Sequence, residues 1–255
     1  LKARKPEQDE SVPYEKNGYR YQWRFNAGDQ YRVWLRQSIM DTSNVWETLL
    51  NENSLAEGCE YFRLGALAVS PDGTKLAYST DSNGSERFIL QVIEIASGNA
   101  LTTPIENCAG SVVWNADSDG FAYRLVNENW RPDKALYRSL HGGDDTVLYQ
   151  EEDDAFFVGL GLSQSEQLMF ITSGDHVTSE VRFVPRAHLL AEQELIQGRR
   201  EGHEYDVEHQ GDSAGTGRLI IRSNRNHPNF DLFETPVASA EEASWQMLLP
   251  GDANH

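Results

Sequence analysis

A unit of about 45 to 50 residues recurs along this chain, and the repeat limits the possible folds more than any other feature. Residues 67–78 read as strand, tight turn and strand, and residues 112–123 repeat the same order of apolar and turn residues. This inner hairpin recurs at spacings of 45, 47 and 51 residues, with its second strand beginning at Leu76, Phe121, Leu168 and Leu219. A period of this length, filled with strands and turns, is typical of β-propeller blades.

Each unit carries a second, outer hairpin that completes a four-stranded antiparallel blade. The outer hairpins are short β-branched and aromatic runs separated by turn residues, and they cover residues 88–102, 135–149, 181–196 and 230–249. An earlier unit over residues 19–50 brings the number of blades to five. The sequence therefore predicts an all-β chain without helices. A β-sandwich is the alternative, but it has no reason to repeat a four-strand unit.

Composition and charge narrow the possible partners. The chain has 255 residues, of which 39% are hydrophobic, and 22 basic residues against 40 acidic ones give a net charge of −18. An acidic chain repels nucleic acid and favours a basic partner or peptide, although a solvated acidic surface explains the same charge. No window approaches 18 consecutive apolar residues and no apolar region follows the basic N-terminus, so neither a membrane span nor a signal peptide is expected, and the expected location is cytoplasmic.

Cysteines and histidines give no sign of a disulfide framework, a metal or a cofactor. Cys59 follows a turn and Cys108 precedes a strand, so both are expected to be buried or half-buried thiols. The seven histidines are scattered, and His203 and His209 share no helix that would bring them together. The sequence therefore predicts no metal-ligand set.

Two short motifs resemble parts of hydrolase active sites, but their positions in the repeat predict turns. Residues 211–215 match the G-x-S-x-G elbow, in which a serine sits between a strand and a helix. Here a strand, not a helix, follows Ser213, and the segment occupies the hairpin-turn position that residues 71–73 occupy in the second unit. His141-Gly142-Gly143 likewise falls in an outer-hairpin turn. No catalytic residue is assigned in this chain.

From Ser11 to about Leu249 the chain resembles the propeller portion of the prolyl oligopeptidase family of serine peptidases, and especially its oligopeptidase B branch. The resemblance is carried by residues 9–19, 53–65, 105–114 and 200–209, spaced in that order. It implies a parent enzyme with an α/β-hydrolase domain, a Ser-His-Asp triad and a propeller of about seven blades. It also implies a parent that cuts short peptides, in this branch after Arg or Lys, and excludes folded proteins.

The chain departs from this pattern, because the hydrolase domain and about two blades are missing after His255 and the chain begins at Leu1. We therefore expect a fragment, with residues 1–12 as a linker and residues 13–255 as an incomplete propeller of five of the expected seven blades. The fragment alone should be inactive. Its ends should expose strand edges and apolar blade faces, so self-association is expected.

Charged loop residues at the blade faces are the candidates for contact with the peptide or with the hydrolase domain. They are Arg131, Asp133, Glu151, Glu152, Asp153, Asp154 and His203. A solvated loop charge is the simpler interpretation of each of them and is favoured over a contact role. The rival function is a stand-alone propeller that serves as an interaction platform, but the chain has no Trp-Asp pair of the kind such propellers carry. A glycan- or metal-binding propeller enzyme lacks a supporting His or carboxylate cluster.

Overall fold

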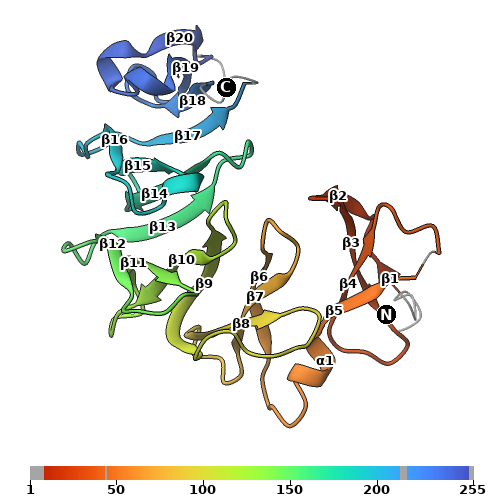
Figure 1. Cartoon of the computed structure of the whole chain (residues 1–255). Helices are drawn as coiled ribbons and strands as arrows, with labels where there is room; N and C mark the ends of the chain where they lie inside the picture. The colour runs from red at the N-terminus through yellow and green to blue at the C-terminus, as the bar shows by residue number, and fades with distance from the viewer. Residues whose placement is uncertain (1–8, 44, 213–216, 253–255) are drawn as a thin grey trace, which may run out of the picture. The chain divides into compact units, whose positions relative to one another are not determined.

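The computed structural model describes residues 9–43, 45–212 and 217–252 as antiparallel sheets joined by turns (Figure 1). The chain divides into two compact units, residues 1–105 and residues 106–255. The all-β prediction is confirmed, and the sheets are those of an incomplete β-propeller.

The first sheet of the first unit is built on β3 (Tyr19–Phe25), which pairs with β4 (Val33–Ser38), and β4 pairs with β5 (Glu47–Asn51). Two short strands, β1 (Asp9–Glu10) and β2 (Tyr14–Lys16), lie one after the other along the free edge of β3. Between them Pro13 lacks the N–H that a continuous strand would donate. Residues 9–12 of the predicted linker are therefore partly a paired strand, and this corrects the expected boundary.

The second sheet of this unit contains β6 (Arg63–Val69), β7 (Lys75–Asp81) and β8 (Phe88–Glu94). Its predicted fourth strand is reduced to a single bridge between Ile93 and Ala100. A one-turn helix, α1 (Glu52–Leu55), precedes this sheet, and the Asn51 side chain caps it by accepting a hydrogen bond from the Asn53 N–H. The expectation of no helix is therefore wrong at this point.

The strands of the second unit form three successive groups of four, which follow one another in Figure 1, and the last two groups are separate four-stranded sheets. The strands of the first group are β9 (Ile105–Trp114), β10 (Gly120–Val126), β11 (Pro132–Ser139) and β12 (Thr146–Gln150). Those of the second are β13 (Phe157–Leu162), β14 (Leu168–Gly174), β15 (Ser179–Pro185) and β16 (Glu194–Gln197). Those of the third are β17 (Tyr205–Gln210), β18 (Arg218–Ser223), β19 (Asp231–Pro236) and β20 (Gln246–Leu249). Single 3₁₀ turns cover Arg186–His188, Val237–Ser239 and Glu242–Ser244.

The core of the second unit lies between successive sheets. Met169 and Ile171 of β14 pack into the cluster with the β9–β12 sheet, while Leu168 and Phe170 pack into the cluster with the β17–β20 sheet. Because β14 is covered on both faces, its sequence is a continuous apolar run rather than an alternating one.

The far face of the β17–β20 sheet carries charged pairs beside the partly exposed Ile220 and Leu232, which differs from the expected apolar blade face. In β18, Leu219 and Ile221 are buried against the preceding sheet, whereas Arg218 and Arg222 are exposed on the other side. Arg222 forms an ion pair with Asp206 at 2.6 Å, and Arg218 pairs with Glu234. Charged pairs thus occupy the face that internal sheets fill with apolar side chains.

Both hydrolase-like motifs lie between paired antiparallel strands, as predicted. Gln210 is opposite Arg218, so residues 211–217 join β17 to β18, and a strand follows them. Ser213 itself lies outside the described residues. His141, Gly142 and Gly143 lie between β11 and β12, and both glycines have left-handed φ values of 94° and 98°.

Cys59 and Cys108 form no disulfide. Cys108 lies inside β9 and is buried, but Cys59 is exposed after α1, contrary to the expectation that both thiols would be covered.

Candidate functional site

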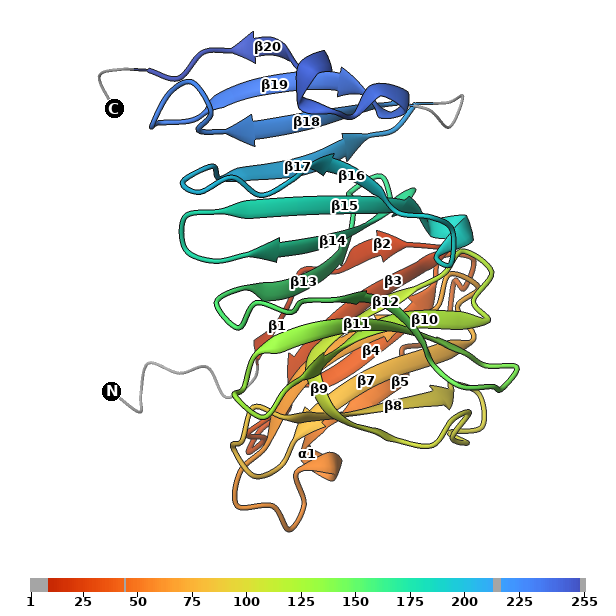
Figure 2. The same ribbon diagram turned by 90° about the vertical axis from the view of Figure 1, so that its left-hand side faces the viewer.

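One end of the three sheets of the second unit gathers the loops on which most of the predicted contact residues lie. We call this end the crossover face, and it consists of residues 127–131, 151–156, 175–178, 198–204 and 224–230 (left-hand side of Figure 2). Backbone hydrogen bonds join two of these loops to neighbouring strands, β11 and β15. The Glu151 N–H donates to Asp133 at 2.8 Å, and the Ser179 N–H donates to His203 at 2.9 Å.

A cavity of about 400 Å³ opens between β13 and β17 on this face. Phe157, 40% exposed, contributes its ring to the wall. The Arg131 guanidinium lies 4.6 Å from the centroid of the same ring. Gly159 is part of the same wall, and a side chain at this position would collide with the Thr172 hydroxyl. The lining is therefore aromatic and backbone-rich, with room beside Phe157 for an extended ligand.

Asp175 and Asp206 are among the residues that line the same cavity, and so is Arg124. One oxygen of Asp175 accepts hydrogen bonds from the Val177 and Thr178 N–H groups at 2.9 and 2.7 Å, which fixes the direction of its side chain. Asp206 is paired with Arg222 on its outer side. The Arg124 guanidinium donates to the Ser111 hydroxyl and to the Val158 carbonyl. The lining therefore combines aromatic rings, which can pack on an apolar stem, with acidic residues and one arginine. The described lining contains hydroxyl groups but no histidine, so it holds no serine–histidine pair.

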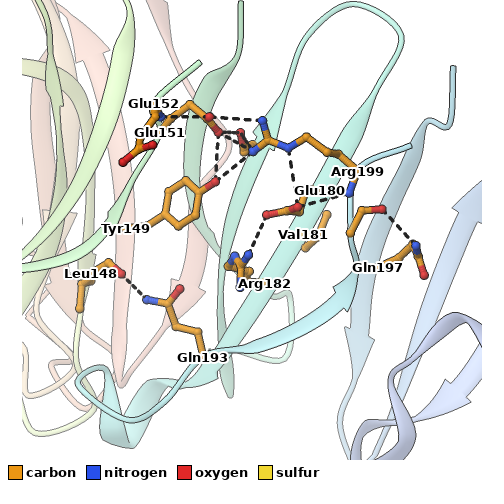
Figure 3. Close-up of polar contacts among 12 residues, drawn as sticks. Leu148, Tyr149, Glu151, Glu152, Glu180, Val181, Arg182, Gln193, Gln197 and Arg199 are labelled. Atoms are coloured by element: carbon orange, nitrogen blue, oxygen red, sulfur yellow. Dashed lines mark hydrogen bonds and ion pairs between the residues drawn. The ribbon is translucent and has the colours of Figure 1, made fainter. Parts of the chain in front are cut away.

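Beneath this face, an ion-pair network joins the β9–β12 sheet to the β13–β16 sheet (Figure 3). Arg199, in the loop after β16, donates to Glu151 at 2.6 Å and to the Tyr149 hydroxyl at 3.2 Å. Ser173 of β14 also donates to Glu151, and the Arg199 backbone N–H donates to Glu180 at 3.2 Å. The Arg199 guanidinium covers the Phe156 ring at 4.2 Å. We call this set the Arg199–Glu151 network.

The electrostatics of the Arg199–Glu151 network make it a structural element. Burial raises the pKa of the Glu151 carboxyl, but hydrogen bonds from Arg199 and Ser173 outweigh burial and bring the pKa down to about 2. The hydrogen bond to Glu151 raises the pKa of Arg199 in turn. A carboxylate with so low a pKa does not act as a general acid or base near neutral pH.

The structure separates the predicted contact residues into two groups. Glu151 and His203 are buried, at 8% and 2% exposure, so the prediction that they are accessible contacts is wrong. The three acidic residues Glu152, Asp153 and Asp154 are exposed on the crossover face, while Arg131 and Asp133 are half-buried there. Glu151 is covered because Arg199 reaches it from a loop 48 residues away.

His203 is a core histidine. Its Nε2 is hydrogen bonded to Ser223 at 2.8 Å, and its ring stacks on Tyr205 at 5.2 Å between centroids. Burial lowers the pKa of His203, and the nearby Arg200 lowers it further. His203 is therefore expected to be neutral at physiological pH and to hold the 198–204 loop against the last sheet.

Sequence reasoning missed Phe157, Asp175, Asp206 and Arg199. Asp175 and Asp206 look like ordinary turn and strand residues, because only the packing of β13 against β17 brings them to one cavity. Phe157 gave a weak signal, since it is an aromatic residue beginning an inner strand that otherwise alternates with glycine.

The described residues contain neither a metal-binding group nor a membrane-spanning helix. In residues 9–43, 45–212 and 217–252, no group of three or more His, Cys, Asp and Glu side chains is arranged to hold a metal ion. Among the helices of the described chain, none has the length and apolar character needed to cross a membrane.

Successive antiparallel four-stranded groups of strands define the class of β-propeller domains. Over residues 1–255 the chain matches the family described as prolyl oligopeptidase, N-terminal beta-propeller domain. The chain belongs to this family.

Relatives and solved structures agree with this assignment. The chain is 29% identical to Protease 2 of Moraxella lacunata over 92% of its own length, and 29% identical to dipeptidyl aminopeptidase BI of Pseudoxanthomonas mexicana over 96%. Oligopeptidase B from Leishmania major superposes on 97% of the chain with a TM-score of 0.88 and 23% identity. Oligopeptidase B from Trypanosoma brucei does so with a TM-score of 0.86 and 26% identity. The chain spans 34% and 35% of the two curated relatives and 35% of each solved chain.

Proposed function

We propose that this chain is the substrate-gating propeller of a serine oligopeptidase whose parent hydrolyses short peptides after Arg or Lys. The observation that carries the proposal is the match of residues 1–255 to the propeller domain of a peptidase family. The preference for basic residues is supported by Asp175 in the cavity of the crossover face and by the net charge of −18.

In this proposal the bond-breaking residues belong to the hydrolase domain of the parent, which supplies the nucleophile, base and oxyanion donors. The propeller acts by geometry. Its loops admit a flexible peptide and exclude a folded chain, and docking of the two domains shields the reaction from water. Asp175, fixed by two backbone N–H groups, attracts and orients a cationic side chain, while Phe157 packs against its methylene stem.

The test is an assay of the parent enzyme with matched fluorogenic peptides that end in Arg, Lys, Pro or Leu before the reporter group. We expect cleavage after Arg and Lys, and no cleavage of a folded protein that contains the same bond. In the parent, Asp175→Asn should raise KM for the basic substrates several-fold with little change in kcat, because a positioning charge is lost. Equal cleavage of all four peptides would contradict the proposed specificity.

A stand-alone interaction platform is the alternative function. Sequencing of the full coding region distinguishes the two functions, because only the peptidase proposal requires it to encode a hydrolase domain. In the alternative, the crossover face binds a protein partner, and no peptidase activity depends on it.

Two further features belong to the proposal. We propose a cytoplasmic location, supported by two cysteines that form no disulfide. We also propose that the chain by itself associates with a second copy through β20, where Met247, Leu248 and Leu249 are 52%, 43% and 58% exposed.

A further inference from the structure

A second cavity on the crossover face is basic, although the chain as a whole is strongly acidic. It has a volume of about 520 Å³ and is lined by Arg200, Arg225, Asn226, Glu242 and Ala243. Arg200 comes from the 198–204 loop, Arg225 and Asn226 come from the β18–β19 hairpin, and Glu242 begins a 3₁₀ turn. Three segments that are distant in sequence thus place two guanidinium groups around one opening.

The two arginines share one carboxylate, and they do so at long range. Arg200 contacts the Glu242 carboxylate at 3.3 and 3.4 Å, and Arg225 approaches it at 3.7 Å. Charge-assisted bonds usually measure about 2.7–2.9 Å, and the Arg199–Glu151 and Arg222–Asp206 pairs in the same unit reach 2.6 Å. The cavity therefore keeps a net positive charge and guanidinium donors that Glu242 does not fully use.

Arg225 is held in place before any ligand arrives. Its guanidinium lies 4.8 Å from the Phe233 ring centroid and 5.5 Å from that of Trp245, and it donates to the Glu242 carbonyl at 3.1 Å. Trp245 is itself fixed by a hydrogen bond from its indole N–H to the Ala240 carbonyl at 2.9 Å. A guanidinium fixed by aromatic rings loses little conformational entropy when it binds an anion.

Arg200 supplies the adaptable half of the cavity. Its side chain is 52% exposed, against 25% for Arg225. Underneath, burial lowers the pKa of His203, and the charges of Arg200 and Arg225 lower it further while Glu242 raises it.

We propose that this basic cavity binds the C-terminal carboxylate of a short peptide that lies on the crossover face. The inference rests on the proposed function, since a short peptide always carries one terminal carboxylate. Guanidinium forks match the planar geometry of a carboxylate, and the Asn226 amide adds a neutral donor at the rim. Asp175, in the cavity beside Phe157, and the basic cavity then recognise opposite charges of the same ligand, a basic side chain and a chain end.

The test compares two labelled tetrapeptides of identical sequence, one with a free C-terminal acid and one with a C-terminal amide, binding to the 255-residue chain. We expect the acid to bind about three- to tenfold more tightly than the amide, as one charge-assisted contact in a partly exposed site provides. Arg200→Ala should remove this preference. Arg222→Ala removes an equally exposed arginine outside the cavity and should keep the preference.

Glu242→Gln distinguishes a binding role from a structural one. Removal of the competing carboxylate should strengthen the preference for the free acid, whereas a merely structural Glu242 would give an unchanged or weakened preference. Thermal melts of every variant establish that each remains folded.

Equal affinity for acid and amide, or no binding of either peptide, overturns the inference. Inorganic phosphate at matched ionic strength serves as a further competitor. The affinities of both peptides are measured again in the presence of phosphate. If phosphate does not weaken the binding of one peptide more than that of the other, and the acid still binds more tightly than the amide, the carboxylate assignment holds. If phosphate is retained by Arg200 while acid and amide bind equally, the cavity takes phosphate and the proposal is wrong. The proposed function has a separate test. It fails if the parent enzyme binds the C-terminal acid more tightly than the amide but cleaves none of the Arg and Lys peptides.

Discussion

Gly73 illustrates how single residues set the turns of this fold. It has a φ of 73°, which side chains resist, and its carbonyl accepts a hydrogen bond from Arg36. Within the same turn, Asp72 accepts hydrogen bonds from Lys75 and Ser70. Burial raises the pKa of Asp72, but these hydrogen bonds outweigh it and hold the pKa well below the usual value. The Pro-Asp-Gly sequence predicted this turn, because each residue type suits its backbone position.

Gly73→Val should lower the free energy of unfolding by about 1 kcal/mol or more, because a side chain must adopt a left-handed φ. An added Cβ would also lie 3.0 Å from the Tyr19 ring. Gly98→Val is the matched control, since Gly98 has a φ of 72° but an added Cβ there meets no described atom within 4 Å. Urea denaturation should rank Gly73→Val as the more damaging change. An unchanged midpoint for both variants would mean that these turns are not left-handed.

Glu151→Gln should destabilise the chain by about 2–4 kcal/mol near neutral pH, because it leaves the Arg199 guanidinium without its main partner. The Glu151 pKa lies near 2 in the folded chain and near 4.5 otherwise. Its stabilisation is therefore complete above about pH 4.5 and is lost as the pH falls toward 2. The difference between wild type and variant should shrink over this window.

Urea titrations at several pH values measure this dependence, with Glu152→Gln as the control. Glu152 is the exposed neighbour, and its substitution should change stability little. A difference between wild type and Glu151→Gln that stays constant from pH 6 to pH 3 would contradict the assigned pKa.

Among the elements, the positions of the strands were predicted well, whereas the burial of the side chains in the loops between them was not. The second strands begin at Lys75, Gly120, Leu168 and Arg218, within one residue of the prediction, because turn chemistry and apolar patterning are local signals. The paired strand Asp9–Glu10 was missed because it contains two acidic residues and no apolar pattern. The burial of His203 and Glu151 depends on side chains 20 and 48 residues away, which a local pattern does not contain.

The position of residues 211–217 between two antiparallel strands predicts that Ser213 is not a nucleophile. The purified chain should show no hydrolysis of a fluorogenic Arg peptide or an ester above the buffer rate. Ser213→Ala should behave identically, because a hairpin connection lacks the strand-to-helix geometry that exposes a catalytic serine. Activity that disappears in Ser213→Ala would show that the motif is a true nucleophile elbow.

At the scale of the whole molecule, charge and exposed apolar residues have opposite effects on association. A net charge of −18 keeps copies of the chain apart, and the charged pairs on the far face of the β17–β20 sheet add no apolar surface. The exposed Met247 and Leu249 of β20 favour contact. Salt should therefore promote association, since it screens the repulsion without weakening apolar contact.

Light scattering at increasing concentration should show a dimer whose population rises with salt. Met247→Asp with Leu249→Asp should shift the chain to monomer, because charges replace the apolar contact. Val147→Asp, at an equally exposed position on the outer strand β12, should leave the dimer intact. A strictly monomeric wild type at high concentration and high salt would rule out association through β20.

The pairing of strands with their sequence neighbours also has a consequence for how the chain is made. Every described strand pairing between β9 and β20 joins consecutive strands within one sheet, so each sheet closes only short loops at small entropic cost. A ribosome adds about 5–20 residues per second, so one repeat leaves it within several seconds. The β13–β16 sheet is then complete before β17 emerges, and Leu168 and Phe170 stay in water until the next sheet covers them. During translation this chain should therefore fold sheet by sheet. The apolar face of the most recently folded sheet stays exposed to water until the next sheet packs on it.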